Sequence, residues 1–283
     1  MDARPLGLIA GEGIFPILVA RGAKAAGRRV ICAGFDGMAD PKLVDEVDAY
    51  RPVSFVRVTS WTRFLRKHDV AEAIMVGRVA KQNLHVKHEM LWALRQVPDW
   101  ATFWAWFTEF RHDRRSETVL LRTAHELEKR GVTLIDSTTF NKDQLADEGV
   151  MTRRSPSETE ARAIERGWHL GGMLTREDVG QSMAVRDRDV LAIEATEGTD
   201  AMIRRAGDLC RGGGWVLLKR GNTRRDPRMD VPTIGLKTIE TIKAAGASCV
   251  CVEAGHVMLL ERERVLAAAN EAGLCIVGRR SDD

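Results

Sequence analysis

The sequence predicts an α/β protein with two domains, of which the first contains a parallel, doubly wound sheet. Two observations carry this prediction. Short apolar strands alternate with helical stretches along the chain, and this alternation is typical of parallel sheets. The chain also has 283 residues, 44% of them hydrophobic, which is enough for two domains that each bury their own core.

The N-terminal half opens with an apolar strand at 6–10, followed by a glycine turn and a helix over 14–24. Further strands are expected at 29–33, 53–57 and 73–77, and further helices near 61–69 and 115–130. Gly131 follows the last of these helices, and we place the domain boundary there. The predicted domains are therefore 1–131 and 132–283.

The second domain is expected to begin with a strand at 132–136 and a polar stretch over 137–157. Helices and strands then alternate again to the end of the chain. The expected helices cover 157–177, 199–210, 235–245 and 262–272, and the expected strands cover 182–186, 189–194, 215–219, 248–253 and 257–260. This order favours a second α/β domain.

The composition excludes several classes of protein. The 43 cations and 40 anions leave a net charge of +3, which fits neither a disordered chain nor a strongly basic nucleic-acid binder. The five cysteines are odd in number and lack zinc-site spacing, so we expect neither a disulfide framework nor a zinc site. No apolar run approaches the about 18 residues of a membrane span, and no signal-like leader is seen. We therefore expect a cytoplasmic protein without a nucleic-acid partner.

Gly11, Glu12 and Gly13 lie between the first strand and the first helix. Glycines at this place let backbone N–H groups approach a phosphate at the positive end of the helix dipole. The dinucleotide fingerprint is incomplete, because Pro16 replaces its third glycine and Asp48 lies too far along to be the usual ribose-binding acid. This disfavours a nicotinamide oxidoreductase. A turn that only joins strand to helix is the alternative to a phosphate site.

Acidic residues and a threonine follow the strand expected at 189–194. Thr199 is expected at the N-cap of the next helix, where free N–H groups suit an anion, and Glu194 and Glu197 are candidates for a metal or for ribose hydroxyls. Helix capping by Thr199 with Asp200 in the first turn explains the same residues without a ligand.

The densest charge cluster follows the strand expected at 215–219. Five cations and two acids lie between Lys219 and Asp230. Cations suit a pyrophosphate, since planar Arg side chains contact two phosphate oxygens at once. Among these cations Asp226 stays ionised, which suits it to hold Mg²⁺ or orient a water. The alternation of Asp226, Arg228 and Asp230 favours a site over a solvated loop.

Two further features are less specific. Glu253 ends the strand expected at 248–253, where ligand sites of open α/β sheets collect. Seven of the 16 aromatic residues lie between Trp92 and Phe110, and five of them share one helical face. Such a stripe forms either a core or an apolar surface for acyl chains or a membrane.

The motifs together resemble one family, the LpxI-type UDP-2,3-diacylglucosamine pyrophosphatases. The similar segments occur in the family's order at 6–16, 197–202, 219–235 and 252–255. The resemblance implies a homodimer with an N-terminal Rossmann-like parallel sheet domain and a distinct C-terminal α/β domain. It also implies a peripheral enzyme of lipid A biosynthesis at the cytoplasmic face of the inner membrane. Such an enzyme hydrolyses UDP-2,3-diacylglucosamine at the α-phosphorus to UMP and 2,3-diacylglucosamine 1-phosphate, using Mg²⁺ or another divalent cation such as Mn²⁺.

The resemblance also gives roles to residues. The family's essential aspartate falls on Asp226, the expected metal ligand, and Arg228, Asp230 and Lys219 complete the candidate catalytic group. The candidate substrate-binding residues are Gly11, Glu12, Gly13, Gly77, Gln181, Thr199, Asp200, Arg225, Glu253 and Gly255. The chain departs from the family at Glu12, where glycine is usual, and over 222–225, where LysProXGln is usual. A nucleotide-sugar-binding sensor or scaffold without turnover is the alternative function.

Overall fold

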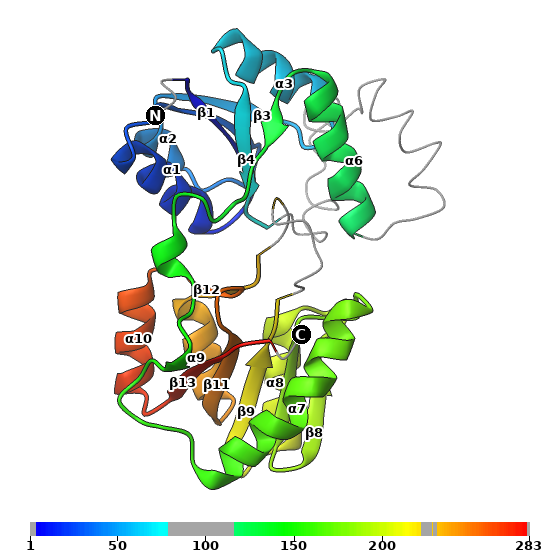
Figure 1. The fold of residues 1–283 in the computed structure, drawn as a ribbon, viewed down its shortest axis with the longest axis vertical. Coiled ribbons are helices and arrows are strands. Elements are labelled where there is room, and N and C mark those ends of the chain that lie inside the picture. Colours follow the sequence, from blue (N-terminus) through cyan, green and yellow to red (C-terminus); the bar gives the residue numbers. More distant parts are fainter. Residues whose placement is uncertain (1–3, 79–115, 222–227, 229–230, 282–283) are drawn as a thin grey trace. The chain divides into compact units, whose positions relative to one another are not determined.

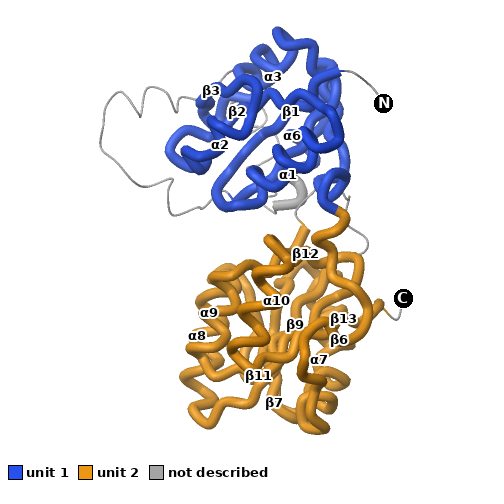
Figure 2. Tube along the Cα trace, turned by 90° about the vertical axis from the view of Figure 1, so that its left-hand side faces the viewer, with its two compact units in different colours: residues 1–141, 226–230 blue, residues 142–225, 231–283 orange. Residues whose placement is uncertain are grey.

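A computed structural model describes residues 4–78, 116–221, 228 and 231–281, with side chains omitted for 116–119. The chain forms two compact units (Figure 2). The first comprises Met1–Asn141 with Asp226–Asp230, and the second comprises Lys142–Arg225 with Val231–Asp283. This division falls after the boundary expected at Gly131, because the strand that follows Gly131 pairs within the sheet of the first unit.

The first unit is built on a five-stranded sheet in the order β3-β2-β1-β4-β5. Its strands are β1 (Leu6–Ala10), β2 (Val30–Phe35), β3 (Ala49–Val53), β4 (Glu72–Val76) and β5 (Thr133–Leu134). Its helices are α1 (Phe15–Ala25), α2 (Leu43–Glu46), α3 (Val58–Lys67) and α6 (Ser116–Lys129). Each pair of neighbouring strands is parallel, which confirms the predicted Rossmann-like sheet.

Alternating residues of the strands bury one face of this sheet under α3 and α6. Ile31 and Phe35 of β2 pack with Trp61 of α3 and Leu127 of α6 in one apolar cluster. The Phe35 and Trp61 rings lie 5.2 Å apart between centroids. The helices that connect β1 to β2 and β2 to β3 belong to the other face, because right-handed crossovers change face where the strand order reverses.

One strand of the first unit differs from the prediction. The sequence predicts a strand at 53–57, whereas the structure has β3 at Ala49–Val53 and a turn into α3. The turn is held by Trp61, whose Nε1 donates to the Ser54 carbonyl at 2.7 Å. β3 lies at the sheet edge and contains Pro52, which an edge strand tolerates because it lacks only one donor. The sequence of β3 lacks the alternation of apolar and polar residues by which strands are predicted.

The second unit contains a six-stranded mixed sheet in the order β6-β13-β11-β9-β7-β8. Its strands are β6 (Gly149–Val150), β7 (Ser182–Arg186), β8 (Asp189–Ile193), β9 (Trp215–Lys219), β11 (Ala247–Glu253) and β13 (Cys275–Arg279). Its helices are α7 (Glu158–Arg176), α8 (Thr199–Leu209), α9 (Leu236–Ala244), α10 (Arg262–Glu271) and a short 3-10 helix at Lys142–Gln144. β10 (Thr233–Ile234) and β12 (Met258–Leu259) form a separate pair. This confirms a distinct C-terminal α/β domain.

Residues of the second sheet alternate between two cores, one on each face. Val216 and Leu218 of β9 pack with Trp168 of α7, which lies along one face of the sheet (Figure 1). Leu217, between them, packs with Ile203 of α8 in the core that also receives α9 and α10. The period of two along β9 therefore explains why helices cover both faces.

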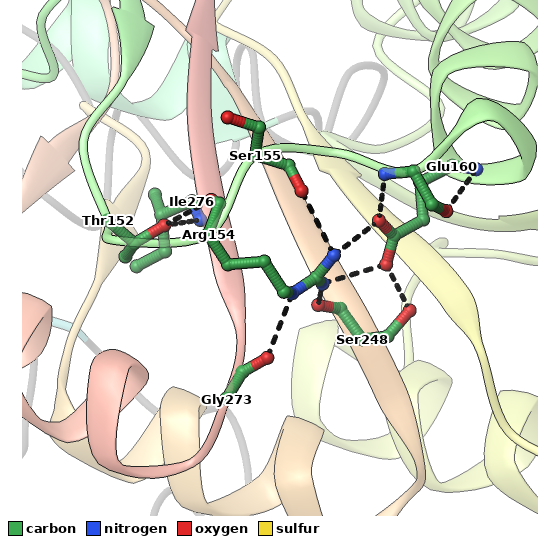
Figure 3. Close-up of polar contacts among 8 residues, drawn as sticks. Thr152, Arg154, Ser155, Glu160, Ser248, Gly273 and Ile276 are labelled. Carbon is green, nitrogen blue, oxygen red and sulfur yellow. Dashed lines mark hydrogen bonds and ion pairs between the residues drawn. The ribbon is translucent and has the colours of Figure 1, made fainter.

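A polar network holds the segment that leads into α7 at the amino-terminal end of β11 (Figure 3). The Arg154 guanidinium donates to both oxygens of Glu160, at 2.7 and 2.8 Å. It also donates to the carbonyls of Ser248, at the start of β11, and Gly273, just before β13. Ser157 caps α7 and exchanges hydrogen bonds with Glu160 in a capping box.

Candidate functional site

Polar side chains gather at the edge of the second sheet where the parallel strands end. Lys219 and Glu253 are the last residues of β9 and β11. Because β7 runs antiparallel to β9, its first residue, Ser182, lies in register with Lys219. Glu194 follows β8, and its N–H donates to the Ser182 carbonyl at 2.9 Å. Sites of open α/β sheets collect at this edge.

The hydroxyl of Thr199, at the start of α8, connects three of these side chains. It accepts a hydrogen bond from Lys219 Nζ at 3.1 Å and donates one to Glu194 Oε1 at 2.8 Å. Ser182 Oγ lies 3.5 Å from the same oxygen. We call Ser182, Glu194, Thr199 and Lys219 the Thr199 cluster. The structure thus brings together two predicted site residues, Thr199 and Lys219, that are far apart in the sequence.

The Thr199 cluster contains an amine and a carboxylate in a largely buried place. Lys219 is 6% exposed. The Oε2 atom of Glu194 is buried and has no hydrogen-bond partner within the described part of the chain. A buried carboxylate oxygen without a partner is costly, so this atom is suited to a ligand that donates a hydrogen bond or coordinates it.

Thr199 differs from its predicted role as an N-cap. The N-cap of α8 is Gly198, whose φ of 83° lies in the left-handed region, and Thr199 is the first helical residue. Its side chain therefore serves the Thr199 cluster rather than a helix N–H group. Asp200 does not join this cluster, because its carboxylate pairs with the exposed Lys237 of α9 at 3.3 Å.

Glu253 is fully buried and both of its oxygens have protein partners. Arg220 Nη2 donates to Oε1 at 3.1 Å, and the Gly221 N–H donates to Oε2 at 2.8 Å. In this structure, burial and these bonds occupy the Glu253 carboxylate, and its contact with substrate stays a prediction. It anchors instead the two residues that follow β9, which is where the charged segment begins.

Arg220 completes this anchor beneath α7. Its guanidinium donates to the Trp168 carbonyl at 2.9 Å and to Ser281 Oγ at 2.8 Å, and lies 4.4 Å from the centre of the Trp168 ring. A Cβ on Gly172 would lie 2.4 Å from Arg220 Nη1, so α7 needs glycine there to admit the side chain. The sequence pattern includes Arg220 only as one cation of a run and gives no sign of this burial.

Gln181 and Gly255 have backbone roles in the structure. The Gln181 carbonyl accepts a hydrogen bond from the Arg220 N–H at 2.9 Å. Gly255 has a φ of 75°, which favours glycine, and its N–H donates to the Ala146 carbonyl at 2.9 Å. The Gly255 N–H is therefore not available to a phosphate in this structure.

In the first unit, the end of β1 meets the end of β4 too closely for side chains. A Cβ on Gly11 would lie 2.8 Å from the Arg78 carbonyl, and one on Gly77, whose φ is 96°, would lie 2.7 Å from the Gly11 backbone. The N–H groups of Gly11 and Glu12 donate to the carbonyls of Val76 and Arg78, each at 2.9 Å. In this structure these two N–H groups are therefore bonded to the last residue of β4 and to Arg78 just beyond it, and phosphate binding by the turn stays a prediction.

Several predicted residues lie outside the described residues. These are Arg225, Asp226 and Asp230 of the charged segment, and the aromatic stripe at 92–110. Arg228 is described and half-buried. Glu12, the departure from the family turn, faces the exposed Arg78 guanidinium at 3.5 Å. Glu12 therefore forms an ion pair in the turn that follows β1.

The described side chains fit an anion better than a metal. No three His, Cys, Asp or Glu residues within the described ranges are grouped to hold a metal ion. Mg²⁺ is commonly held by one or two carboxylates together with substrate phosphates, so one protein carboxylate is compatible with it. The Glu194 oxygen without a partner has the right chemistry, whereas the amine of Lys219 in the same cluster favours phosphate.

Both parts of the chain match known domain families. Residues 5–144 match the LpxI N-terminal domain, and residues 147–277 match the LpxI C-terminal domain. The chain belongs to the LpxI family. It is 30% identical over 285 aligned residues to the UDP-2,3-diacylglucosamine pyrophosphatase LpxI of Caulobacter vibrioides, covering 97% of each chain. The two LpxI domains match the two compact units closely, since the second unit begins at Lys142.

Proposed function

We propose that the protein is a hydrolase of lipid A biosynthesis that cleaves the pyrophosphate of UDP-2,3-diacylglucosamine. The LpxI of Caulobacter vibrioides, which aligns along nearly the whole chain, is named for this activity. The observation that carries the proposal is the Thr199 cluster at the carboxyl end of β9. Lys219 of this cluster begins the charged segment that contains Asp226, which we propose as the essential aspartate.

In the proposed reaction, a water oxygen forms a bond to the α-phosphorus as the bond from that phosphorus to the bridging oxygen breaks. The bridging oxygen leaves on 2,3-diacylglucosamine 1-phosphate (lipid X), and UMP retains the oxygen of the water. The water protons pass to a base or to solvent. No protein nucleophile is needed, because positioning and electrostatic stabilisation supply most of the catalysis of phosphoryl transfer.

The residues of this chain have separate proposed roles. Asp226 orients the attacking water, and Asp230 and Arg228 support the same segment. The buried amine of Lys219 neutralises charge on phosphate oxygens, and its bond to Thr199 fixes its direction. Glu194 keeps Thr199 oriented through the 2.8 Å hydrogen bond between them. The anchored pair of Arg220 and Glu253 fixes the backbone from which the segment departs.

A divalent cation, Mg²⁺ or Mn²⁺, is part of the proposal. When bound, such an ion neutralises phosphate charge and polarises the phosphorus–oxygen bonds. We propose Asp226 as its protein ligand.

We also propose that the protein acts as a homodimer at the cytoplasmic face of the inner membrane. The helices of the described ranges include none that is both long enough and apolar enough to cross a bilayer. The acyl chains of the proposed substrate lie in a membrane, so its sugar nucleotide is reached from the membrane surface. We therefore propose that the protein attaches peripherally to the membrane surface.

Replacing Asp226 with alanine tests the catalytic proposal. We expect Asp226→Ala to lower turnover at least about 100-fold, since it removes the group that orients the water, and to leave substrate binding largely intact. Hydrolysis in ¹⁸O-labelled water, read by mass spectrometry, should place the label in UMP and none in the sugar phosphate. The matched control is Asp208→Ala, which removes an exposed carboxylate near the end of α8.

Two outcomes would overturn the proposal. Near-normal turnover by Asp226→Ala would remove this residue from the mechanism. Tight binding of UDP-2,3-diacylglucosamine by the unmodified protein, with no UMP released in the presence of Mg²⁺ or Mn²⁺, would identify the nucleotide-sugar-binding sensor or scaffold instead.

A further inference from the structure

Three of the five cysteines lie on one face of the second sheet, beneath α7. Cys249 and Cys251 belong to β11, and Cys275 begins β13. All three are fully buried in the core that contains Trp168, whereas Val250, between the first two, packs in the core on the other face. Each of the three is a free thiol in this structure. The proposed hydrolysis uses none of them.

Cys249 and Cys275 are direct neighbours across two parallel strands. Their Cα atoms are partners in the register of β11 with β13, and both side chains pack on the α7 face. Neighbouring strands lie about 4.8 Å apart, and a disulfide joins Cα atoms that are about 4.4–6.8 Å apart. The two residues are 26 positions apart in the sequence, so their spacing gives no sign that the fold pairs them.

Cys251 lies on the same face but opposite a different residue. Its register partner on β13 is Val277. Two residues along a strand span about 6.6 Å, so the Cα atoms of Cys251 and Cys275 are roughly 8 Å apart, which is too far for a disulfide. The same span separates the Cβ atoms of Cys251 and Cys249, which a disulfide needs at about 3.8 Å. The register therefore singles out one pair.

The Arg154 guanidinium binds the backbone next to this pair (Figure 3). It donates to the carbonyl of Ser248, the residue before Cys249. It also donates to the carbonyl of Gly273, two residues before Cys275. The Arg154 side chain is 36% exposed, so the starts of both strands lie close to solvent. A small oxidant therefore has a short path to this end of the pair.

The thiols on this face differ in acidity. Hydrogen bonding from Cys249 lowers the pKa of Cys275 and outweighs its burial, with smaller contributions from Thr152 and Arg154. The same interaction raises the pKa of Cys249, because the donating thiol keeps its proton. Burial raises the pKa of Cys251 to about 12. Since the thiolate is the nucleophile, Cys275 is the thiol that reacts first.

We propose that Cys249 and Cys275 form a reversible disulfide when a hydroperoxide oxidises the folded protein. The Cys275 thiolate sulfur bonds to one peroxide oxygen as the oxygen–oxygen bond breaks, which gives a sulfenic acid and hydroxide. The Cys249 sulfur then displaces the sulfenic oxygen, which leaves with the Cys249 proton as water. The hydroxide takes up the proton that Cys275 had released. The two sulfurs together lose two electrons, and the peroxide gains them.

Peptide mapping of the full chain after exposure to hydrogen peroxide tests this pair. Catalase removes the peroxide before the protein is unfolded, so that only the folded protein is oxidised. Of the five thiols of the chain, we expect three to remain after treatment. Trypsin cleaves after Lys and Arg, and its fragments 244–262 and 265–279 should be joined. Dithiothreitol should separate the fragments and restore the thiol count.

Two variants identify the sulfurs in the bridge. Cys251→Ala is the matched control, because it removes a buried thiol from the same strand and the same face. It should form the bridge as the unmodified protein does, whereas Cys249→Ala should form none. Without its partner, Cys275 should instead be oxidised to the sulfinic acid, which dithiothreitol does not reduce. Circular dichroism checks that both variants are folded.

Three results would contradict this proposal. The folded protein could retain all five thiols under an exposure that oxidises the unfolded chain, which would show that the oxidant does not reach the pair. The bridge could appear only in protein that had unfolded. Joined fragments in Cys249→Ala would assign the bridge to Cys251. The unmodified protein alone decides the first two, and none of the three bears on the hydrolysis, since the pair contains no residue of the Thr199 cluster.

Discussion

At the scale of single residues, Glu160 is the clearest case of a carboxylate stabilised in its ionised form. Burial alone would raise its pKa, but hydrogen bonds from Arg154, Ser248 and the Ser157 N–H outweigh this effect and lower the pKa to about 2. Ser248 lies at the start of β11, and Arg154 also bonds to the Gly273 carbonyl just before β13 (Figure 3). The Thr199 cluster lies instead where the parallel strand β9 ends. We therefore assign Glu160 to stability and not to catalysis.

The low pKa of Glu160 predicts an acid-sensitive contribution to folding. The folded protein binds this proton less readily than the unfolded chain, whose Glu pKa is about 4.3. The contribution is therefore present above that value and is lost as pH falls from about 4 to about 2. Glu160→Gln should lower the free energy of unfolding at pH 7 by about 2 kcal/mol or more, because Arg154 loses its charged partner.

Urea unfolding at several pH values measures this effect. The difference between Glu160→Gln and the unmodified protein should shrink toward zero as the pH approaches 2. Glu158→Gln, which changes an exposed acid of the same helical turn, is the control and should show a small difference at every pH. A Glu160→Gln difference that stayed constant with pH would contradict the assignment.

At the scale of elements, the close contact between the ends of β1 and β4 depends on two glycines. Gly77→Ala should lower the free energy of unfolding by about 2–4 kcal/mol, because it adds a clash with the Gly11 backbone to an unfavourable positive φ. The matched control is Gly27→Ala, which has a φ of 79° but nothing within 4 Å of the added Cβ. It should cost about 1 kcal/mol, from backbone strain alone. Equal losses in thermal or urea unfolding would show that the contact is unimportant.

Local sequence patterns predict some strands of this fold and not others. The strands predicted at 6–10 and 215–219 match β1 and β9 to the residue, because each is a buried apolar run between turns. β6 and β10 have two residues each, too few for a periodic signal. No strand is predicted at β13, although it is an apolar run. Whether such a run pairs with β11 or lies in a loop is decided by packing outside the run.

The candidate site likewise combines residues that local motifs mark with contacts that depend on how the strands pair. Lys219 and Thr199 can be singled out from local motifs, but their contact depends on the antiparallel pairing of β7 with β9 and on the course of β8. The same pairing brings in Ser182, which no motif marks. Gly11 and Glu12 illustrate the converse, since their motif is typical of phosphate binding while the neighbouring strand end uses their N–H groups. Roles that depend on strand order are invisible in a local pattern.

At the scale of the whole molecule, each compact unit has its own sheet and its own apolar cores. The core beneath α3 and α6 draws its buried residues from between Ile9 and Leu134. The two cores of the second unit draw theirs from between Ala146 and Ile276. In each unit, polar side chains lie at the carboxyl ends of parallel strands: Asp36 lines a surface cavity in one unit, and the Thr199 cluster lies in the other.

This separation of cores predicts that residues 142–283 fold without the rest of the chain. The segment contains every strand of the six-stranded sheet and all the buried residues of its two cores, so its burial does not depend on the first 141 residues. Expressed alone, it should unfold cooperatively in urea with a free energy of roughly 5 kcal/mol or more. Leu217→Ala, at a fully buried position of β9, should lower that value by about 3 kcal/mol in both the segment and the full chain. A segment that unfolds without cooperativity and binds a hydrophobic dye would show that the second sheet requires the first unit to pack.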